Sequence, residues 1–461
     1  MSKPNVKFLP IYHVMRALVR FGLHLYYRRL KIVGYEDVPK GVPLFFASNH
    51  QNAFMDALLL GGNTKGRQQP NYITRSDVFN PKTLSFLSTW KMLPIYRQRD
   101  GKDYLQKNEE MFHKYIDLLK NGDSIVIFPE GNHGRVRKLR VLRKGIGRIG
   151  FQAMEEMDGN FDDILMVPVG LNYSAHKNLR SDALVIFGEP IGIKKYYEQH
   201  KNKDRRALID LRNDLAKGIQ DEMIHIKSPE YYETIEGLRT ISSEELLEQS
   251  PAPKKDQLAR LRVEQNMIKK VEEGMANESI DGPSLKEDVE TYFNGIEELG
   301  IRDHVVRTQP HGMPGLILQA LGLLISFPAF AWGWLNHILV YNFAVRFTRK
   351  TFKDDHFHSS MMFIIAFFLF PLSYLLLAGI AWAIFGWQIA LAYFLTLPLF
   401  GNFSLVYSRW FKKFRGKWRF QTALQGGNST ANSLVGLREK IMGVVRKAVK
   451  AGQPVMEGSQ A

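Results

Sequence analysis

The chain contains no cysteine among its 461 residues, which excludes disulfide bonds and metal sites built on thiolates. We expect no secretory signal peptide, because Arg16 and Arg20 interrupt the N-terminal apolar residues and no small-residue cleavage site follows them. The glycine–serine pattern of a nucleophile elbow is also absent, which argues against a serine hydrolase. No set of histidine and carboxylate residues has the spacing of a metal site, so we expect no metal.

Acidic residues are in deficit: 62 Lys and Arg face 46 Asp and Glu, and the formal net charge is +16 at pH 7. Such an excess indicates an anionic partner, which can be nucleic acid, a membrane surface or a substrate. No basic stretch is interleaved with aromatic residues as in RNA-binding domains, so we expect no nucleic acid. Long apolar segments near the C-terminus favour a membrane instead.

Residues 1–30 are predicted to contain an amphipathic helix. Two rows recur at helical spacing. One row is basic and consists of His13, Arg16, Arg20 and His24, and the other is apolar and consists of Ile11, Val14, Leu18, Phe21 and Leu25. This pattern is typical of a helix that lies in a membrane interface. An ordinary amphipathic helix packed on the neighbouring domain explains the same pattern equally well.

Residues 31–193 alternate short β-rich runs with helical stretches, which predicts an α/β domain with a mostly buried sheet. Strands are expected at residues 31–34, 43–48, 71–74, 124–128, 164–171 and 183–187. Helices are expected at residues 53–60, 77–90, 104–120 and 145–157. Residues 194–307 form a charged helical region without a strand run, with breaks at 250–253 and 281–283.

Two apolar segments follow the helical region. Residues 361–407 lack charged side chains, and each half exceeds the ~20 residues that a spanning helix needs, so we expect a transmembrane hairpin over 359–408. Pro328 interrupts the first apolar segment, so we expect a re-entrant or membrane hairpin over 314–345, with one tilted span as the alternative. Basic clusters follow both segments, the second in a basic tail over 409–461, and the positive-inside rule places both in the cytoplasm.

A histidine directly follows the strand expected at 43–48. Asp56 lies within two helical turns of this residue, His50. A carboxylate can hold one imidazole nitrogen while the other nitrogen accepts a proton from an attacking hydroxyl, as in general-base catalysis. His50 is therefore a candidate base and Asp56 its orienting acid, although such a pair taken alone more often has only a structural role.

The strand expected at 124–128 ends in Pro129-Glu130-Gly131, at the carboxyl edge of the sheet where ligands bind in open α/β folds. A basic run follows it, made of Arg135, Arg137, Lys138, Arg140, Arg143 and Lys144. Guanidinium groups bind phosphate in a bidentate manner, and amides at the start of a helix near Gly145 would add to this binding. A solvated charged loop is the alternative interpretation.

Two weaker runs complete the pattern. Pro94-Ile95-Tyr96-Arg97 places an arginine after a short apolar run, and Pro168 breaks a strand, which suggests an edge or a bulge near a site. The order of these residues resembles the order of the motifs of the glycerophospholipid acyltransferase family: His50 with Asp56, then Arg97, then Glu130, then Pro168. The resemblance covers about residues 30–190 and implies a two-layer α/β acyltransferase domain at a membrane surface.

The resemblance also assigns roles to single residues. His50 matches the catalytic base of the family, and Asp56 matches the orienting acid. The substrate-binding residues are matched by Arg97, Glu130, Gly131, Arg143 and Lys144, and Pro168 matches the proline of the fourth motif. The family implies an acyl-CoA or acyl-carrier protein as donor and no cofactor.

The chain departs from the usual family pattern at two places. Five residues separate His50 from Asp56, where most members have four, as in a subgroup that includes fungal-type glycerol-3-phosphate acyltransferases with C-terminal hydrophobic helices. One extra residue turns a helical position by ~100°, so the intervening loop must absorb the difference. Many members also have threonine and arginine after Glu-Gly; here Asn132 and His133 follow, and Arg135 is expected to supply the missing charge.

The resemblance therefore implies a multi-pass membrane protein that transfers an acyl group to glycerol 3-phosphate in phospholipid biosynthesis. Its expected partners are a phospholipid membrane, a glycerol phosphate acceptor and an acyl donor, with the catalytic domain on the cytoplasmic face. The main alternative is a lysophosphatidic acid (1-acylglycerol-3-phosphate) acyltransferase. A lysophospholipid transacylase and a catalytically dead membrane scaffold are the remaining alternatives.

Overall fold

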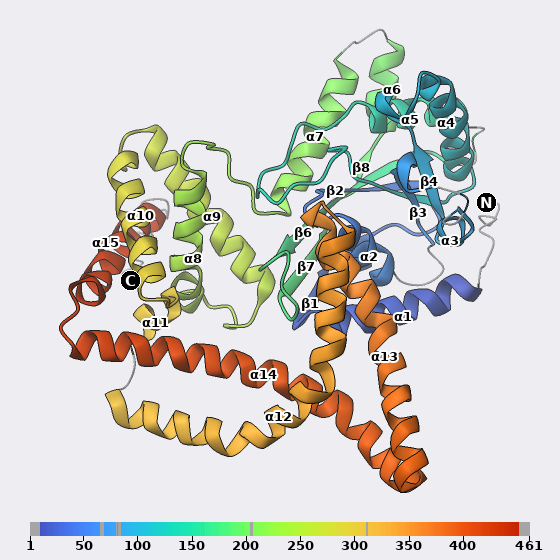
Figure 1. The fold of residues 1–461 in the computed structure, drawn as a ribbon. Coiled ribbons are helices and arrows are strands. Elements are labelled where there is room, and N and C mark those ends of the chain that lie inside the picture. The colour runs from blue at the N-terminus through green and yellow to red at the C-terminus, as the bar shows by residue number, and fades with distance from the viewer. Residues whose placement is uncertain are drawn as a thin grey trace, which may run out of the picture. The chain divides into compact units, whose positions relative to one another are not determined.

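The computed structural model describes residues 10–450 apart from 65–68, 80, 82–83, 158, 160, 203–205 and 310–311. The chain forms two compact units (Figure 1). The α/β unit comprises Met1–His225 with Thr348–Ile364, and the helical unit comprises Ile226–Phe347 with Ile365–Ala461. A short segment between two long C-terminal helices therefore belongs to the α/β unit.

The α/β unit contains an eight-stranded sheet, which confirms the predicted fold class. Its strands are β1 (Arg29–Val33), β2 (Leu44–Ser48), β3 (Asn71–Arg75), β4 (Met92–Ile95), β5 (Ser124–Ile127), β6 (Leu165–Tyr173), β7 (Asp182–Phe187) and β8 (Ile191–Gly192). The strand order is β1-β7-β6-β2-β5-β3-β4, and β8 also pairs with β6. Strands β6, β2, β5, β3 and β4 run parallel, so their carboxyl ends share one edge.

Helices cover both faces of this sheet. On one face lie α4 (Tyr104–Lys120), α5 (Gly145–Glu155) and α7 (Ala207–Asp221), whose apolar side chains pack with Phe45 and Ile125 in one buried cluster. On the other face, the strand register places Phe46 and Tyr72 on either side of Val126. There α2 (Phe54–Asn63) comes so close that a Cβ at Gly61 would overlap the Tyr72 hydroxyl.

Helix α1 (Pro10–Tyr26) has two apolar faces rather than one. The first face, which includes Val19 and Leu23, is buried and packs on α2. The second face is exposed and consists of Val14, Leu18, Phe21 and Leu25. The helix is thus packed on its domain, as one prediction had it, and still presents the apolar row that the interfacial interpretation requires.

Strand β6 corrects the prediction made from its proline, because it lies inside the sheet between β2 and β7. Pro168 pairs with Ala47 of β2, and its carbonyl accepts a hydrogen bond from Gly188 N at 2.8 Å. A strand residue directs its carbonyl and its N–H toward the same side, so the missing N–H points into the gap between the β6–β7 and β6–β8 pairings. The proline is tolerated here because no partner carbonyl is left without its donor.

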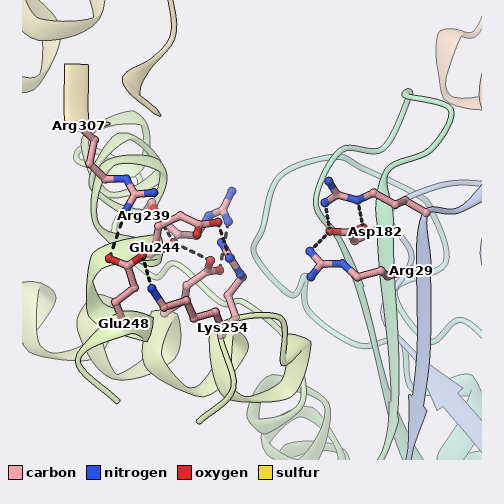
Figure 2. A network of polar contacts seen from close by, with 11 residues as sticks. Arg29, Asp182, Arg239, Glu244, Glu248, Lys254 and Arg307 are labelled. Carbon is pink, nitrogen blue, oxygen red and sulfur yellow. Dashed lines mark hydrogen bonds and ion pairs between the residues drawn. The ribbon is translucent and has the colours of Figure 1, made fainter. Parts of the chain in front are cut away.

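The remaining short elements of the α/β unit before residue 225 are α3 (Leu84–Thr89), α6 (Lys194–Lys201) and three single 3-10 turns at Tyr35–Asp37, Ser76–Val78 and Gln98–Asp100. The outer strands are tied by charge: Asp182 at the start of β7 binds the guanidinium groups of Arg28 and Arg29 (Figure 2).

In the helical unit, α8 (Tyr232–Glu248), α9 (Gln257–Ala276), α10 (Gly282–Glu298) and α15 (Ser429–Lys450) pack against one another. Both expected breaks in this region are present, and Asp281 caps α10 by accepting the amide of Ser284. The region expected to be a basic tail, residues 409–461, is also partly structural, because it contains α15. Arg438 of α15 is buried and donates to Asp303 of α11 (Asp303–Thr308), to Glu245 and to the carbonyl of Ile241.

Among the residues that the structure describes, three helices are long and apolar enough to cross a membrane: α12 (Gly312–Thr351), α13 (His358–Phe385, preceded by a 3-10 turn at Asp355–Phe357) and α14 (Trp387–Gln425). Gly386, with φ at 83°, forms the expected turn between α13 and α14. The break expected at Pro328 is wrong, because α12 stays helical through it. A proline inside a helix removes one hydrogen bond and can bend the helix without ending it, and α12 changes direction along its length (Figure 1).

Candidate active site

The predicted site residues follow different strands of the parallel sheet. His50 comes two residues after β2 ends, Glu130 follows β5, and Arg97 follows β4. Strands β2 and β5 are neighbours, so His50 and Glu130 lie close together at the shared carboxyl edge. Strand β4 is three strands away from β2, which corresponds to about 14 Å at the usual strand spacing.

The structure contains the predicted hydrogen bond between the histidine and the aspartate. Nδ1 of His50 lies 2.8 Å from Oδ2 of Asp56, and the Asp56 side chain is fully buried. The same Oδ2 accepts the backbone amides of Gln51 and Asn52, at 2.9 and 2.8 Å. Oδ1 accepts the hydroxyl of Tyr173, from β6. Four donors therefore hold this carboxylate in one orientation.

The loop between the pair absorbs the extra residue at Ala53. This alanine precedes α2 with φ at 45° and ψ at −127°, a conformation that residues with a Cβ rarely adopt. Such backbone strain costs about 1–3 kcal/mol and is concentrated at functional sites in proteins. The backbone conformation of Ala53 stands at the start of α2, and the Asp56 side chain of this helix faces His50.

The imidazole of His50 keeps one nitrogen available for chemistry. Because Nδ1 pairs with Asp56, Nε2 is the nitrogen that can accept a proton. The ring stacks on Phe128 with centroids 4.1 Å apart and an interplanar angle of 16°. Its side chain is 16% exposed, so a substrate can reach it although the ring is held on two sides.

Glu130 binds the backbone of the site. Its Oε1 accepts the amide of His50 at 2.7 Å, and its Oε2 accepts the amide of Arg140 at 3.1 Å. Burial raises the pKa of Glu130, and these two amides oppose that rise. The carboxylate expected to bind substrate is thus occupied in joining the loop after β2 to the loop after β5, and Gly134 N adds a bond to the carbonyl of His50.

Unpaired cations lie over this second loop. Gly131 has φ at 71°, and the side chain of Arg143 packs within 3.3 Å of where its Cβ would be. The Arg140 guanidinium covers Gly134 in the same way. Arg140, Arg143 and Lys144 are exposed, and none has an ion-pair partner among the residues that the structure describes. Lys144 precedes the first turn of α5, whose amides add positive potential.

The other two predicted cations already have carboxylate partners. Arg97 contacts Asp77 at 2.8 Å and Asp100 at 3.2 Å, at the β4 end of the sheet. Arg135 contacts Asp355 at 2.7 Å, and Lys177 contacts the same carboxylate at 2.6 Å. Arg143 and Lys144 therefore have no carboxylate partner among the described residues. Arg135 is bound to the carboxylate of Asp355, and Arg97 lies away from His50.

Asp355 belongs to a segment that the sequence did not connect with the site. This α12–α13 connection, residues 352–357, lies in the α/β unit. Its Asp354 accepts from Nε2 of His133 at 3.3 Å, and its Phe357 ring lies 5.2 Å from the His133 ring. The His133 ring is itself 5.5 Å from the ring of His50. The connection thus forms part of the wall around the candidate base.

The same segment brings together three groups with metal-ligand chemistry. Ligand atoms of His133, Asp354 and His356 all lie within 4.8 Å of one another. Their donor types suit Zn²⁺. Asp354 already satisfies both rings, since its two oxygens accept from His133 and from Nδ1 of His356. The contacts among these side chains therefore explain their grouping without an ion.

Comparisons with known proteins point to one group of enzymes. Residues 29–172 match the family model described as Acyltransferase. Glycerol-3-phosphate O-acyltransferase 1 of Saccharomyces cerevisiae is 27% identical over 229 residues, which are 47% of this chain and 28% of that protein. Glycerol-3-phosphate O-acyltransferase 2 of the same yeast is 26% identical over 132 residues, or 28% of this chain and 18% of that protein. The chain thus spans less than a third of the length of these relatives.

A solved structure is also similar. It is the crystal structure of the 1-acyl-sn-glycerophosphate acyltransferase PlsC from Thermotoga maritima, with 17% identity and a TM-score of 0.33. The similarity covers 45% of this chain and 79% of that one.

Proposed function

We propose that the protein transfers a fatty acyl group from a thioester to a hydroxyl of glycerol 3-phosphate, which the match of residues 29–172 to the Acyltransferase model and the similarity to the yeast glycerol-3-phosphate O-acyltransferases support. The observation that carries this proposal is the geometry of His50. Its Nδ1 is bound to a buried carboxylate, its Nε2 is available, and unpaired arginines lie over the adjacent loop. A base beside a phosphate-binding surface is what acylation of a phosphorylated alcohol requires.

The reaction needs no covalent enzyme intermediate. Nε2 of His50 accepts the proton of the acceptor hydroxyl while that oxygen attacks the thioester carbonyl carbon. The C–S bond then breaks, and the imidazolium returns the proton to the leaving thiolate. Asp56 stabilises the imidazolium and holds its orientation through the bond to Nδ1.

Arg143, Arg140 and Lys144 are the groups that we assign to the acceptor phosphate. They are the unpaired cations nearest to the loop that Glu130 joins to His50. A phosphate held there fixes which hydroxyl of the acceptor faces Nε2. Positioning of this kind lowers a barrier by up to about 7–11 kcal/mol in well-oriented systems.

Lysophosphatidic acid is the second candidate acceptor, because it carries the same phosphate and one free hydroxyl. The names of the yeast relatives favour glycerol 3-phosphate. The donor is a thioester of coenzyme A or of an acyl-carrier protein. We take acyl-CoA as the first donor to be tested.

The long apolar helices support attachment to a membrane, and the packing of the chain limits how they can cross it. α15 packs on α8, α9 and α10, so the segments before α12 and after α14 lie on one side. The α12–α13 connection contacts the α/β unit, which precedes α8 without a membrane-length helix among the described residues. The chain must therefore cross the membrane an even number of times between α11 and the α12–α13 connection, and again an even number of times between that connection and α15.

This parity gives a specific topology. α13 and α14 cross as a hairpin that turns at Gly386, whereas α12 does not cross and lies along the membrane surface, bent at Pro328. A helix of 40 residues is about 60 Å long, twice the thickness of the hydrocarbon core. The exposed apolar row of α1 is also typical of a helix that lies on a membrane surface. By the positive-inside rule, the basic residues at 346–353 and 409–419 favour the cytoplasm for this side.

The activity is tested with the purified full chain in detergent, with labelled acyl-CoA and the two acceptors offered side by side. His50→Ala should lower turnover by ~100- to 10,000-fold, which is the contribution of a positioned base. His113→Ala, an exposed histidine on α4, is the matched control and should keep full activity. Acylation of neither acceptor, or full turnover by His50→Ala, would refute the proposal.

The topology is tested with single cysteines, because the natural chain has none. A membrane-impermeant maleimide should label Lys353→Cys and Gln425→Cys from the same side and Phe385→Cys only from the other. Labelling of the first two from opposite sides would show that α12 does not lie as proposed.

A further inference from the structure

The helical unit contains a cavity that the proposed reaction does not use. It has a volume of about 510 Å³ and lies where α8, α11, the start of α12 and the basic part of α14 meet. Its walls include Glu244, His304, Arg307, Leu316, Lys413 and Lys417. None of these residues belongs to the candidate active site.

Positive charge dominates this cavity. Lys413 and Lys417 lie four residues apart, on one face of α14, where like charges repel each other. Neither lysine has an ion-pair partner in the part of the chain that the structure describes. Arg307 lies 3.3 Å from Glu248, but that carboxylate also binds Lys254 (Figure 2). The one acidic wall residue, Glu244, is paired with Arg260.

One residue of the cavity wall, His304, also has a ring nitrogen without a partner among the described residues. Nε2 of His304 is buried and has no hydrogen-bond partner among the described residues. Burial lowers the pKa of His304 to about 4, and the charges of Lys413, Arg302, Lys417 and Arg307 act in the same direction. A neutral imidazole can donate one N–H to an anion. A bound anion would thus satisfy the orphaned ring and the unpaired lysines together.

The surroundings of the cavity are apolar on one side. Leu316 forms part of its wall, and the next turn of α12 exposes Leu318 and Leu321, at 72% and 50%. Trp418 on α14 follows Lys417 and is partly exposed, as is typical of tryptophans at membrane interfaces. A volume of about 510 Å³ lies within the range of pockets that hold small ligands, so the cavity accommodates a glycerophosphate headgroup.

We propose that this cavity binds the phosphate group of an anionic membrane phospholipid, with the acyl chains lying against the exposed apolar face of α12. A free phosphate would use the cations but would leave the apolar wall unused, so the lipid is the ligand that the surroundings favour. The proposal rests on the membrane attachment proposed above but does not depend on acyl transfer.

The experiment uses the purified full chain in detergent, titrated separately with dioctanoyl phosphatidylglycerol, dioctanoyl phosphatidylcholine and inorganic phosphate. Binding is followed by the apparent melting temperature, and bound lipid is counted by native mass spectrometry. Phosphatidylglycerol should bind at least tenfold more tightly than either of the other two probes. Because no acyl donor is added and phosphatidylglycerol is not the proposed product, an inactive enzyme would give the same result.

Variants of the cavity lysines provide the decisive comparison. K413Q/K417Q should weaken phosphatidylglycerol binding at least tenfold, and K413R/K417R should restore it to within threefold of the natural chain. K412Q/R415Q removes two charges from the same helix outside the cavity and should change binding less than twofold. His304→Leu, which keeps the bulk of the ring but not its donor, should weaken binding at least fivefold and decides the question if K413Q/K417Q melts early.

Two results would overturn the proposal. Equal affinity of the natural chain and K413Q/K417Q, both folded, would show that the cavity is not the site. Equal affinity for inorganic phosphate and phosphatidylglycerol would show a site for soluble anions and not for lipid.

Discussion

Replacement of Asp56 by asparagine tests the central pair most directly. In the natural chain the carboxylate accepts four hydrogen bonds, from His50, Gln51, Asn52 and Tyr173. Asparagine keeps one accepting oxygen and turns an N–H₂ group toward donors. His50 then loses its charged partner, and a hydrogen bond to a charged group contributes about 1.5–3 kcal/mol. The misplaced tautomer adds to this loss, since the equivalent change in a Ser-His-Asp enzyme lowers kcat by about 10⁴.

We therefore expect Asp56→Asn to lower kcat by about 10³- to 10⁴-fold. The KM for glycerol 3-phosphate should change less than about threefold, because the cations that bind phosphate are not altered. Steady-state rates with acyl-CoA in detergent measure both constants. Tyr173→Phe, which removes only one of the four donors, should lower kcat by about 10-fold.

A matched control separates catalysis from folding. Asp163 also accepts two backbone amides, of Ile164 and Lys194, but it lies before β6 and thus at the opposite edge of the parallel strands. Asp163→Asn should melt at a lower temperature and keep its turnover per folded molecule. If Asp56→Asn remained folded with a kcat within tenfold of the natural chain, the assignment of His50 as a base held by Asp56 would be wrong.

Three further changes test the cations and the helical unit. Arg143→Gln should raise the KM for glycerol 3-phosphate about 10- to 100-fold, as expected for the loss of about 1.5–3 kcal/mol, while kcat and the control Arg148→Gln stay near normal; a lowered kcat alone would contradict this. Hydrogen bonds from Arg135 and Lys177 hold the pKa of Asp355 well below its usual range, so the carboxylate stays charged and competes with substrate phosphate. Asp355→Asn should thus lower that KM about 3- to 10-fold, and a raised KM would show that Asp355 assists binding. Burial and nearby cations lower the pKa of His304 to about 4, so the unfolded chain binds more protons between pH 6.5 and 4 and stability falls as the pH decreases through this window. His304→Gln should remove about 1 kcal/mol of this loss after solvent screening, or about 2–4 °C between melting curves at pH 7 and pH 4.5, and identical pH dependence of the two proteins would refute it.

Much of the α/β unit could be predicted because its information is local. Buried parallel strands are continuous apolar runs, and six of them were located within a few residues of their observed bounds. Strands β4 and β8 were missed because four residues, one of them proline, and two residues do not form recognisable runs. The pairing of His50 with Asp56 was also local, since both residues flank the start of one helix. Their roles in catalysis remain predictions.

Other features depend on contacts between distant parts of the chain. Tyr173 binds Asp56 across 117 positions in sequence, and no periodic pattern identifies such a partner. The place of β6 inside the sheet follows from the order of strands, so its proline gave the wrong location. α12 stays helical through Pro328 because a backbone in apolar surroundings keeps its hydrogen bonds within a helix. The prediction of a break at this proline did not take that tendency into account.

The α12–α13 connection shows why the catalytic domain of this chain cannot be delimited by its motifs. The motifs end near residue 190, yet Asp355 pairs with Arg135 across 220 positions, and Ser359 donates to the buried Asn52 beside the candidate base. Asp355 lies in the connection directly before α13, and Ser359 lies in the first turn of α13. A fragment that ends at residue 225 would contain every motif but would expose the His133 ring and leave Asn52 without this donor. The segment where these long apolar helices meet therefore forms part of the wall of the candidate site.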